Sequence, residues 1–284
     1  MAQYGSRTRR FLTQKGPAYL VLVTLSIPFG FPLVWSICTS LQTLEGVYSE
    51  SMITLPKDPQ WGNYIEVFTT LPLAKFLLNT VYITVGAIAG ELFTAPLVAF
   101  AFARLRFPFR DTLFVIMLST LMLPPIIPLI PTYILFSKFG WTDTYIPLIL
   151  PGWLGGSVFS IFIFRQFFKT IPLDLEDAAK IDGCSTYGIY FRIFLPLAFP
   201  ALATIGVLSF VSRWNDFTTP LIYLQTIDKF PIALGINMMK DAYTSVAPHY
   251  LMAASVISLV PLLVLFFAIQ RVFVEGIILS GIKG

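Results

Sequence analysis

Apolar residues along the chain gather into six long runs that are separated by shorter polar segments. A helix needs roughly 20 mostly apolar residues to cross the hydrocarbon core of a bilayer. We therefore predict an all-α, polytopic membrane protein with six transmembrane helices, in which residues 1–284 form a single transmembrane domain. The six predicted spans lie near residues 17–39, 76–103, 112–136, 147–165, 199–223 and 250–271.

The composition agrees with this pattern. The sequence is 56% hydrophobic and 12% charged, whereas about a quarter of the residues of a soluble domain are charged. The first apolar run is too long for the core of a signal peptide and lacks an A-x-A cleavage site, so we predict an uncleaved first span. The single histidine, His249, argues against a metal site built from clustered ligands.

The distribution of Lys and Arg predicts the orientation. If both termini are cytoplasmic, most of the basic residues fall in the N-terminal tail, the loops 104–111 and 166–198, and the C-terminal tail. This matches the enrichment of basic residues in cytoplasmic loops. Cys38 and Cys184 then lie on opposite sides of the membrane, so no disulfide is expected between them. The net charge of +4 needs no nucleic-acid partner to explain it.

One cytoplasmic loop contains the short charged segment "EDAAKIDG", from Glu176 to Gly183. Pro172 can begin a helix, and the acidic residues that follow favour a helix N-terminus. Gly183 either ends this helix or allows another backbone to come close. The composition of the segment on its own favours a solvated surface helix with ordinary capping.

The spacing around this segment is more specific. The stretch "DAAKIDGCSTYGIYFRIFLP", from Asp177 to Pro196, resembles the E-A-A-x3-G-x9-I-x-L-P motif of ATP-binding-cassette importer permeases, with Asp in the usual place of Glu. Further segments are similar to the maltose-type, MalG-like sugar permeases. They are "AFARLRFPFRD", "LFSKFGWTDTYIPLILP", "FRQFFKTIPLDLEDAAKIDG", "RWNDF" and "RVFVEGIILSGIKG".

The resemblance implies a type I importer permease that carries a carbohydrate across the bacterial inner membrane. Its implied partners are a second, MalF-like permease subunit, two ATPase subunits that bind ATP and Mg²⁺, and an external sugar-binding protein. The loop would form a coupling helix seated in a groove of the ATPase. The residues assigned to ATPase coupling are Glu176, Asp177, Ala178, Ala179, Asp182, Gly183, Ile193, Leu195 and Pro196.

Two further contacts follow from the resemblance. The outer loop 224–249 resembles the region that reaches the binding protein, and the C-terminal tail resembles one that reaches the ATPase dimer. The tail residues concerned are Ser280, Gly281, Lys283 and Gly284.

The chain lacks the G-x4-G-K-[ST] phosphate loop and shows no nucleophile–base set, so we predict a transport subunit with no cofactor of its own rather than an enzyme. The alternative is a secondary transporter or channel of an unrelated polytopic type. Such a protein often shows inverted repeats and paired titratable groups within its spans, and neither is evident here.

Charged residues inside the predicted spans are candidates for function, because they are costly in a bilayer. Arg213 and Asp216 either neutralise each other at i, i+3 spacing or line a substrate pathway. In the second case Trp214 would stack on a sugar ring, and Asn215 or Asp216 would accept its hydroxyls. In maltose-type relatives the sugar site lies mainly in the other permease subunit.

Two other features of the spans predict packing. Glu91 follows the pair Gly86-x3-Gly90, which favours close helix contact. We expect a buried, hydrogen-bonded carboxylate there rather than a proton relay. Prolines 124, 125, 128 and 131 predict a bend in the third span, as a static kink rather than a gate.

Overall fold

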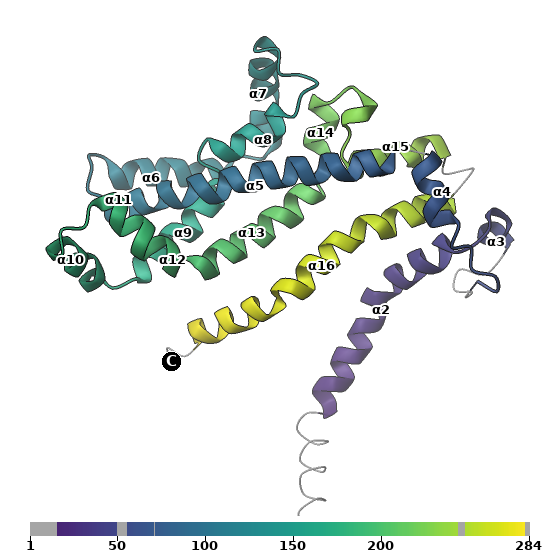
Figure 1. Cartoon of the computed structure of the whole chain (residues 1–284), viewed down its shortest axis with the longest axis horizontal. Helices are drawn as coiled ribbons and strands as arrows, with labels where there is room; N and C mark the ends of the chain where they lie inside the picture. The colour runs from purple at the N-terminus through teal and green to yellow at the C-terminus, as the bar shows by residue number, and fades with distance from the viewer. Residues whose placement is uncertain (1–15, 50–55, 71, 244–247, 282–284) are drawn as a thin grey trace, which may run out of the picture. The chain divides into compact units, whose positions relative to one another are not determined.

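The computed structural model describes residues 16–49, 56–70, 72–243 and 248–281, and every regular element in these ranges is a helix (Figure 1). The chain divides into two compact units. The first comprises Met1–Leu71 with Ile236–Val260, and the second comprises Pro72–Gly235 with Pro261–Gly284. α15 (Ile232–Tyr243) and α16 (Pro248–Gly281) each contribute residues to both units.

The first unit is organised by the junction between its helices. α2 (Gly16–Ser40) is followed by α3 (Leu44–Ser49) and α4 (Asn63–Thr70). The buried Asn63 side chain donates hydrogen bonds to the carbonyls of Ser40, at 2.9 Å, and Gln42, at 3.0 Å. The first bond satisfies a carbonyl that the end of α2 leaves without a helical partner, and the second satisfies one in the loop that follows. The Tyr250 hydroxyl of α16 donates to the Glu66 carboxylate of α4.

The predicted spans correspond to helices of the structure. Four helical segments are long and apolar enough to cross a bilayer, and two bent helix pairs bring the number to six if each pair is one span. The four are Gly16–Ser40, Leu73–Arg104, Ile146–Thr170 and Pro248–Gln270. The all-α membrane fold is confirmed, and the described residues leave the number of spans between four and six.

The third predicted span is sharply bent. α6 (Arg110–Ser119) with η1 (Thr120–Met122) meets α7 (Ile126–Lys138) at 102°. Leu123 between them has an extended backbone, as expected for a residue that precedes a proline. The predicted proline bend is confirmed.

The fifth predicted span bends by 70° where it begins. α11 (Thr186–Ile189), the π-helix η2 (Tyr190–Phe194) and α12 (Leu195–Leu197) run into α13 (Phe199–Trp214). The break lies at Ala198, two residues after Pro196. A proline removes a helical hydrogen bond, and the wider π turn just before it is a common site of helix distortion.

The second unit is built along α5 (Leu73–Arg104). α8 (Ile146–Trp153), α9 (Val158–Thr170) and α13 pack against this long helix (Figure 1). At the end of α5 that approaches α10 (Leu173–Ile181), the rings of Phe100, Phe168 and Phe194 form a buried aromatic cluster. Their centroids lie 5.0 to 6.2 Å apart, with near-perpendicular ring planes, an arrangement that aromatic pairs favour.

Glycines allow α5 and α8 to touch. A Cβ atom on Gly152 would lie 2.3 Å from the Ala87 carbonyl oxygen, and one on Gly90 would lie 2.5 Å from the Trp153 ring. The Trp153 indole N–H donates to the Gly86 carbonyl at 3.0 Å. The close contact that the Gly86-x3-Gly90 spacing predicts is therefore confirmed.

A hydrogen-bond network centred on Asp143 joins two loops of the second unit. The Asp143 carboxylate accepts bonds from the backbone N–H groups of Gln225 and Thr226, each at 3.0 Å, and pairs with Lys229 Nζ at 2.8 Å. It links the α7–α8 connection to the segment between α14 (Thr218–Tyr223) and η3 (Ile227–Lys229). The Lys229 ammonium first, then the Thr226 hydroxyl and the two N–H groups, hold the pKa of the Asp143 carboxyl well below its usual range.

The glycine contact gives a test of the α5–α8 packing. Gly152→Ala should destabilise the protein by about 1–3 kcal/mol, the usual cost of overpacking, because its Cβ would meet a backbone carbonyl. Gly86→Ala is the matched control, since its Cβ would meet only the Ile149 side chain at 3.3 Å. Thermal unfolding of the purified protein in detergent compares them, and equal midpoints would contradict this packing.

The hydrogen-bond network around Asp143 predicts that the stability of the fold depends on pH. Because the folded-state pKa is depressed, the carboxylate stabilises the fold above its unfolded pKa of about 4, and this contribution disappears as pH falls through the folded pKa. Asp143→Asn should lower the melting temperature at pH 7. The gap between wild type and variant should stay constant down to about pH 5 and then narrow. A gap that widens in acid would refute this account.

Candidate functional site

The charged loop contains a short helix with defined ends. α10 (Leu173–Ile181) begins after Pro172, and Asp174 and Glu176 lie in its first turn, where the helix dipole favours negative charge. At the other end the N–H of Cys184 donates to the Ala179 carbonyl at 2.9 Å, and the N–H of Gly183 donates to the Lys180 carbonyl at 3.0 Å. This pair of bonds is the Schellman motif.

Gly183 has φ of +75° in this motif, a conformation that other residues adopt at a cost. A Cβ at Gly183 would meet nothing within 4 Å. Of its two predicted roles, the structure therefore supports ending the helix, and no backbone of the described chain approaches it.

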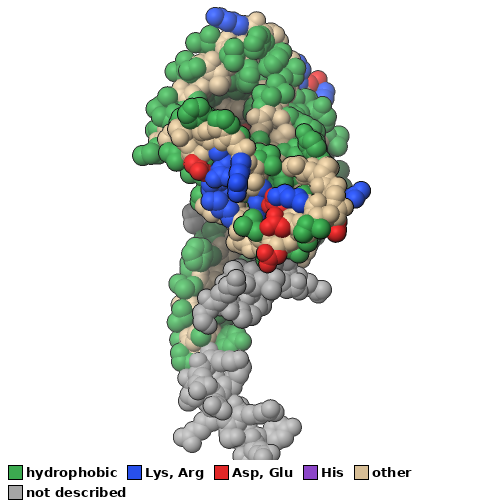
Figure 2. Space-filling view, turned by 90° about the vertical axis from the view of Figure 1, so that its left-hand side faces the viewer, with side chains coloured by type: hydrophobic (Ala, Val, Ile, Leu, Met, Phe, Trp, Pro, Cys, Tyr) green, Lys and Arg blue, Asp and Glu red, His purple; other side chains and the backbone are tan. Residues whose placement is uncertain are grey.

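One face of α10 is open. Asp177, Ala178, Ile181 and Asp182 are exposed, and the Ile181 side chain is 87% accessible. Figure 2 shows basic and acidic side chains gathered around apolar ones on this end of the second unit. The described part of the chain therefore leaves this face of α10 uncovered.

The opposite face of α10 is anchored by Arg104, the last residue of α5. The side chains of Arg104 and Glu176 are 5% and 10% exposed, and their Nη1 and Oε2 atoms lie 3.8 Å apart. The second Glu176 oxygen pairs with Lys180 Nζ at 2.8 Å. Glu176 therefore points into its own subunit, away from the exposed face of the helix.

Arg104 contacts two further elements. Its Nη2 donates to the Phe168 carbonyl at 2.6 Å and to the Ile171 carbonyl, both at the end of α9. Its guanidinium carbon lies 4.8 Å from the centre of the Phe194 ring, within the range of a cation–π contact. One buried cation thus connects α5, α9, α10 and η2. The sequence analysis did not single it out, although it lies within the "AFARLRFPFRD" segment.

The other predicted coupling residues are distributed as follows. Ala179 is buried, Ile193 and Leu195 are half-buried, and Pro196 is exposed. Ser280 and Gly281 end α16, but their side chains lie outside the described part of the chain. Lys283 and Gly284 lie wholly outside it.

A second cluster of charges lies along α5, α9 and α13. Glu91 is 2% exposed, and its Oε1 accepts a hydrogen bond from the Ser160 hydroxyl at 2.6 Å. Its Oε2 lies 3.7 Å from Nη2 of Arg213. Glu91 is thus a buried, hydrogen-bonded carboxylate, as predicted.

Of the two alternatives for Arg213 and Asp216, the one in which they pair with each other is wrong. α13 ends at Trp214, so i, i+3 spacing no longer places the two side chains on one helix face. Arg213 reaches Glu91 instead, and the Asp216 carboxylate accepts the N–H of Thr219 at 3.1 Å, at the start of α14. The partner of Arg213 is far away in sequence, which is why the residue pattern did not reveal it.

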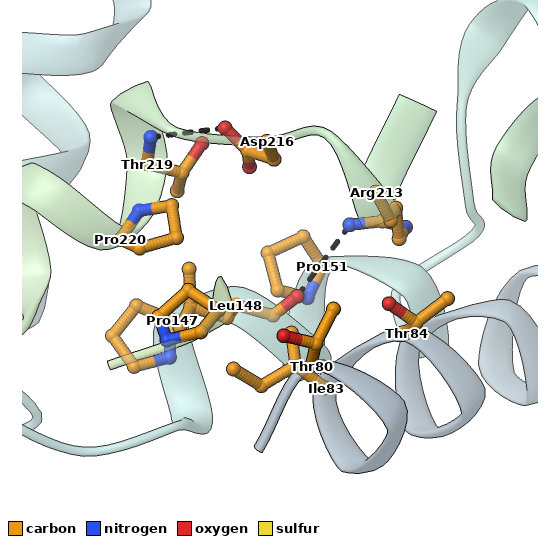
Figure 3. A pocket seen from close by; sticks show the side chains of 11 residues that line it. Thr80, Ile83, Thr84, Pro147, Leu148, Pro151, Arg213, Asp216, Thr219 and Pro220 are labelled. Carbon is orange, nitrogen blue, oxygen red and sulfur yellow. Dashed lines mark hydrogen bonds between the residues drawn. The ribbon is translucent and has the colours of Figure 1, made fainter. Parts of the chain in front are cut away.

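Two cavities border Arg213 and Asp216. The smaller, of about 220 Å³, lies between α5, α8 and α14 (Figure 3). The larger, of about 430 Å³, is lined by residues of α5 and α13 and by the start of α9. Its polar lining residues are Glu91, Ser157, Ser160, Ser209, Ser212, Arg213 and Asp216.

Two residues of the predicted pathway lie elsewhere. Trp214 is 1% exposed and stacks on Phe210, with ring centroids 5.2 Å apart and planes 15° apart. Its ring has no face open to a ligand in this conformation. The exposed Asn215 amide donates to the Val211 carbonyl at 2.8 Å. Neither residue lines the two cavities described above, so Arg213 and Asp216 remain the pathway candidates.

A family model described as the binding-protein-dependent transport system inner membrane component matches residues 83–278. The arabinooligosaccharides transport system permease protein AraQ of Halalkalibacterium halodurans is 34% identical over 89% of this chain and 91% of its own length. The sn-glycerol-3-phosphate transport system permease protein UgpE of Agrobacterium fabrum is 31% identical over 92% and 95%. The lactose transport system permease protein LacG of Rhizobium radiobacter is 30% identical over 92% and 93%.

Solved structures share the fold. A chain of a bacterial ABC transporter for import of the acidic polysaccharide alginate superposes with a TM-score of 0.80 and 23% identity, over 92% of this chain and 97% of that one. A chain from the alginate transporter in complex with a pentasaccharide-bound periplasmic protein gives a TM-score of 0.55 and 16% identity, over 93% and 98%. The predicted fold class is confirmed.

The Arg104 anchor can be tested by substitution. Arg104→Ala leaves the buried Glu176 without this cation and should reduce the free energy of unfolding by about 3–5 kcal/mol, the cost of breaking a buried ion pair. Arg110→Ala is the control, because its partner Asp111 is 71% exposed and such surface pairs contribute at most about 1 kcal/mol. Chemical unfolding in detergent measures both, and similar losses would disprove the anchoring role.

Proposed function

This chain belongs to the family of binding-protein-dependent transport system inner membrane components, and on that premise we propose that it is the transmembrane permease subunit of an ATP-driven carbohydrate importer. Membership of this family makes it a transport component rather than an enzyme. Two of the relatives described above are named for the transport of arabinooligosaccharides and lactose, which supports carbohydrate as the substrate class.

The observation that carries the mechanism is the construction of α10. Its outer face is exposed, while Glu176 and Ala179 on its inner face are buried against the subunit. A force applied to the exposed face would pass through Arg104 to the ends of α5 and α9. These contacts suit a helix that is displaced by a partner, because rigid packed elements transmit displacement.

In this proposal α10 docks on an ATPase subunit through Asp177, Ala178 and Ile181. The ATPase pair binds ATP and Mg²⁺, and its closure moves the helix. The small side chain of Ala178 allows close approach of a partner, and Ile181 supplies an apolar contact of the kind found at interface centres. The work of hydrolysis would then reach the transmembrane helices of this chain.

The proposed importer has two further components, a second permease subunit and an external binding protein. A second permease subunit completes the pathway, and an external binding protein delivers the sugar to the outer loop 224–249, of which residues 244–247 lie outside the described chain. Both termini are assigned to the cytoplasmic side of the inner membrane. The support for this orientation is the Lys and Arg distribution in the sequence.

If the exposed face of α10 is the docking face, a substitution on it should weaken ATPase association without destabilising the subunit. Ala178→Arg adds a long charged side chain to an exposed helical position and should weaken ATPase association by about tenfold or more, equivalent to at least about 1.4 kcal/mol. Its own melting temperature should change little, because Arg is a good helix former. Co-purification with the ATPase subunits and ATP-driven sugar uptake provide the two measurements.

Ser137→Arg is the matched control, because it places the same charge at an exposed position near the end of α7. It should leave ATPase association unchanged. If Ala178→Arg retains both association and uptake, α10 is not the coupling helix and the proposed mechanism fails.

A further inference from the structure

The two cavities that meet at Arg213 and Asp216 are lined by groups that can bind a sugar. Besides these two residues, the larger cavity presents Glu91 and four serines, and the smaller presents three threonines. Serine and threonine hydroxyls both donate and accept, as sugar hydroxyls do. The larger cavity, of about 430 Å³, falls in the size range of small-molecule sites, roughly 300–1,000 Å³.

Thr84 is the lining residue that points most directly to ligand binding. Its side chain is 0% exposed and lines the smaller cavity, and its hydroxyl has no hydrogen-bond partner in the described chain. One helical turn earlier, the Thr80 hydroxyl donates to the Phe76 carbonyl and accepts the Ile232 N–H, both at 2.7 Å. A buried hydroxyl without a hydrogen-bond partner destabilises the fold, so the position of this one calls for an explanation.

Across the smaller cavity, Arg213 and Asp216 also retain unused capacity (Figure 3). The contacts of the Arg213 guanidinium are long, at 3.5 Å to the Leu148 carbonyl and 3.7 Å to Glu91, beyond the usual range of a good hydrogen bond. Only one oxygen of Asp216 accepts a bond within the described chain. Donors and acceptors therefore face the cavities together.

The charges of the lining define which sugars fit. Two carboxylates, Glu91 and Asp216, face one cation, Arg213. The larger cavity thus carries a formal charge of −1. Charge repulsion is much stronger in a site of low dielectric constant than in water. A uronate, a phosphate ester or a sulfonate would be repelled there, whereas neutral hydroxyls can donate to the carboxylates.

Building on the proposed function, we propose that these cavities form a binding site for an uncharged sugar on the transport pathway of this subunit. Thr84, Ser209 and Ser212 bind sugar hydroxyls, Arg213 donates to ring or hydroxyl oxygens, and Asp216 accepts from hydroxyls. Glu91 holds Arg213 in place and, with Asp216, excludes anionic sugars.

The first test separates ligand binding from folding. Thr84→Val keeps the shape and removes the unpaired hydroxyl, so the stability of the sugar-free complex should stay the same or rise. The apparent affinity for a neutral trisaccharide should fall about fivefold, the equivalent of one hydrogen bond. Thr80→Val is the matched control, because its hydroxyl is already bonded twice. It should lower stability instead.

The second test concerns charge. The complete importer, with both permease subunits, the ATPases and the binding protein, is reconstituted in liposomes. Uptake of maltotriose, arabinotriose and trigalacturonate is measured. Wild type should take up a neutral trisaccharide at least tenfold faster than trigalacturonate. The binding protein also selects sugars. The melting temperature of the complex without the binding protein is therefore measured with and without each of the same sugars.

The double variant Glu91→Gln, Asp216→Asn removes both negative charges with little change of shape. In the absence of the binding protein it should gain a thermal shift with trigalacturonate that wild type lacks. Equal shifts with neutral and acidic sugars in wild type, or no shift with either neutral trisaccharide, would overturn the inference. So would a Thr84→Val variant that binds the neutral sugar as wild type does.

The outcomes distinguish this inference from the proposed function. If ATP-driven uptake persists while the cavity variants behave as wild type, the subunit is an importer permease whose sugar site lies elsewhere. If the assembled wild-type complex shows no ATP-driven uptake of any of the three sugars, while the thermal shifts follow the charge rule, the cavity binds sugar but the proposed importer function fails.

Discussion

A buried guanidinium needs hydrogen-bond acceptors, and the end of the second unit that carries α10 is arranged around the guanidinium of Arg104. Its partners are carbonyls at the end of α9, the Glu176 carboxylate on α10 and the face of the Phe194 ring. These groups come from separate parts of the chain, so their contacts with one cation fix the positions of several helix ends together. The short helix α10 is too small to have a core of its own, and this contact gives it a fixed position.

The same long helix connects the two candidate sites. α5 carries Arg104 at its end and, farther along, Glu91 and Thr84 at the cavities. It is held against α8 by contacts so close that only glycine fits at Gly152. A displacement of α10 would therefore reach the cavities through a packed helix rather than through a flexible linker. In the proposed importer, this is how ATPase movement alters the sugar site.

The sequence predicted the features that depend on local chemistry. The helical spans, the proline bend and the role of Gly183 follow from residue types and their spacing. The pairing of Glu91 with Arg213 joins α5 to α13, and no local pattern contains that information. The predicted Arg213–Asp216 pair failed because the helix ends at Trp214, and Trp214 itself is buried against Phe210. The partner of Arg213 and the burial of Trp214 both depend on tertiary packing, which local sequence does not encode.

The Glu91–Arg213 pair also shows why stability alone does not account for the polar interior. Removing two charges from water is costly, and only close geometry with additional hydrogen bonds compensates for it. Here the charged atoms lie 3.7 Å apart, and within the described part of the chain the Arg213 guanidinium donates one other hydrogen bond, at 3.5 Å. Apolar side chains of similar size would often serve stability as well or better. A cation whose contacts are long, facing the same cavity as the unpaired Thr84 hydroxyl, instead remains available to a ligand. In the proposed site, Glu91 and Asp216 together favour an uncharged ligand.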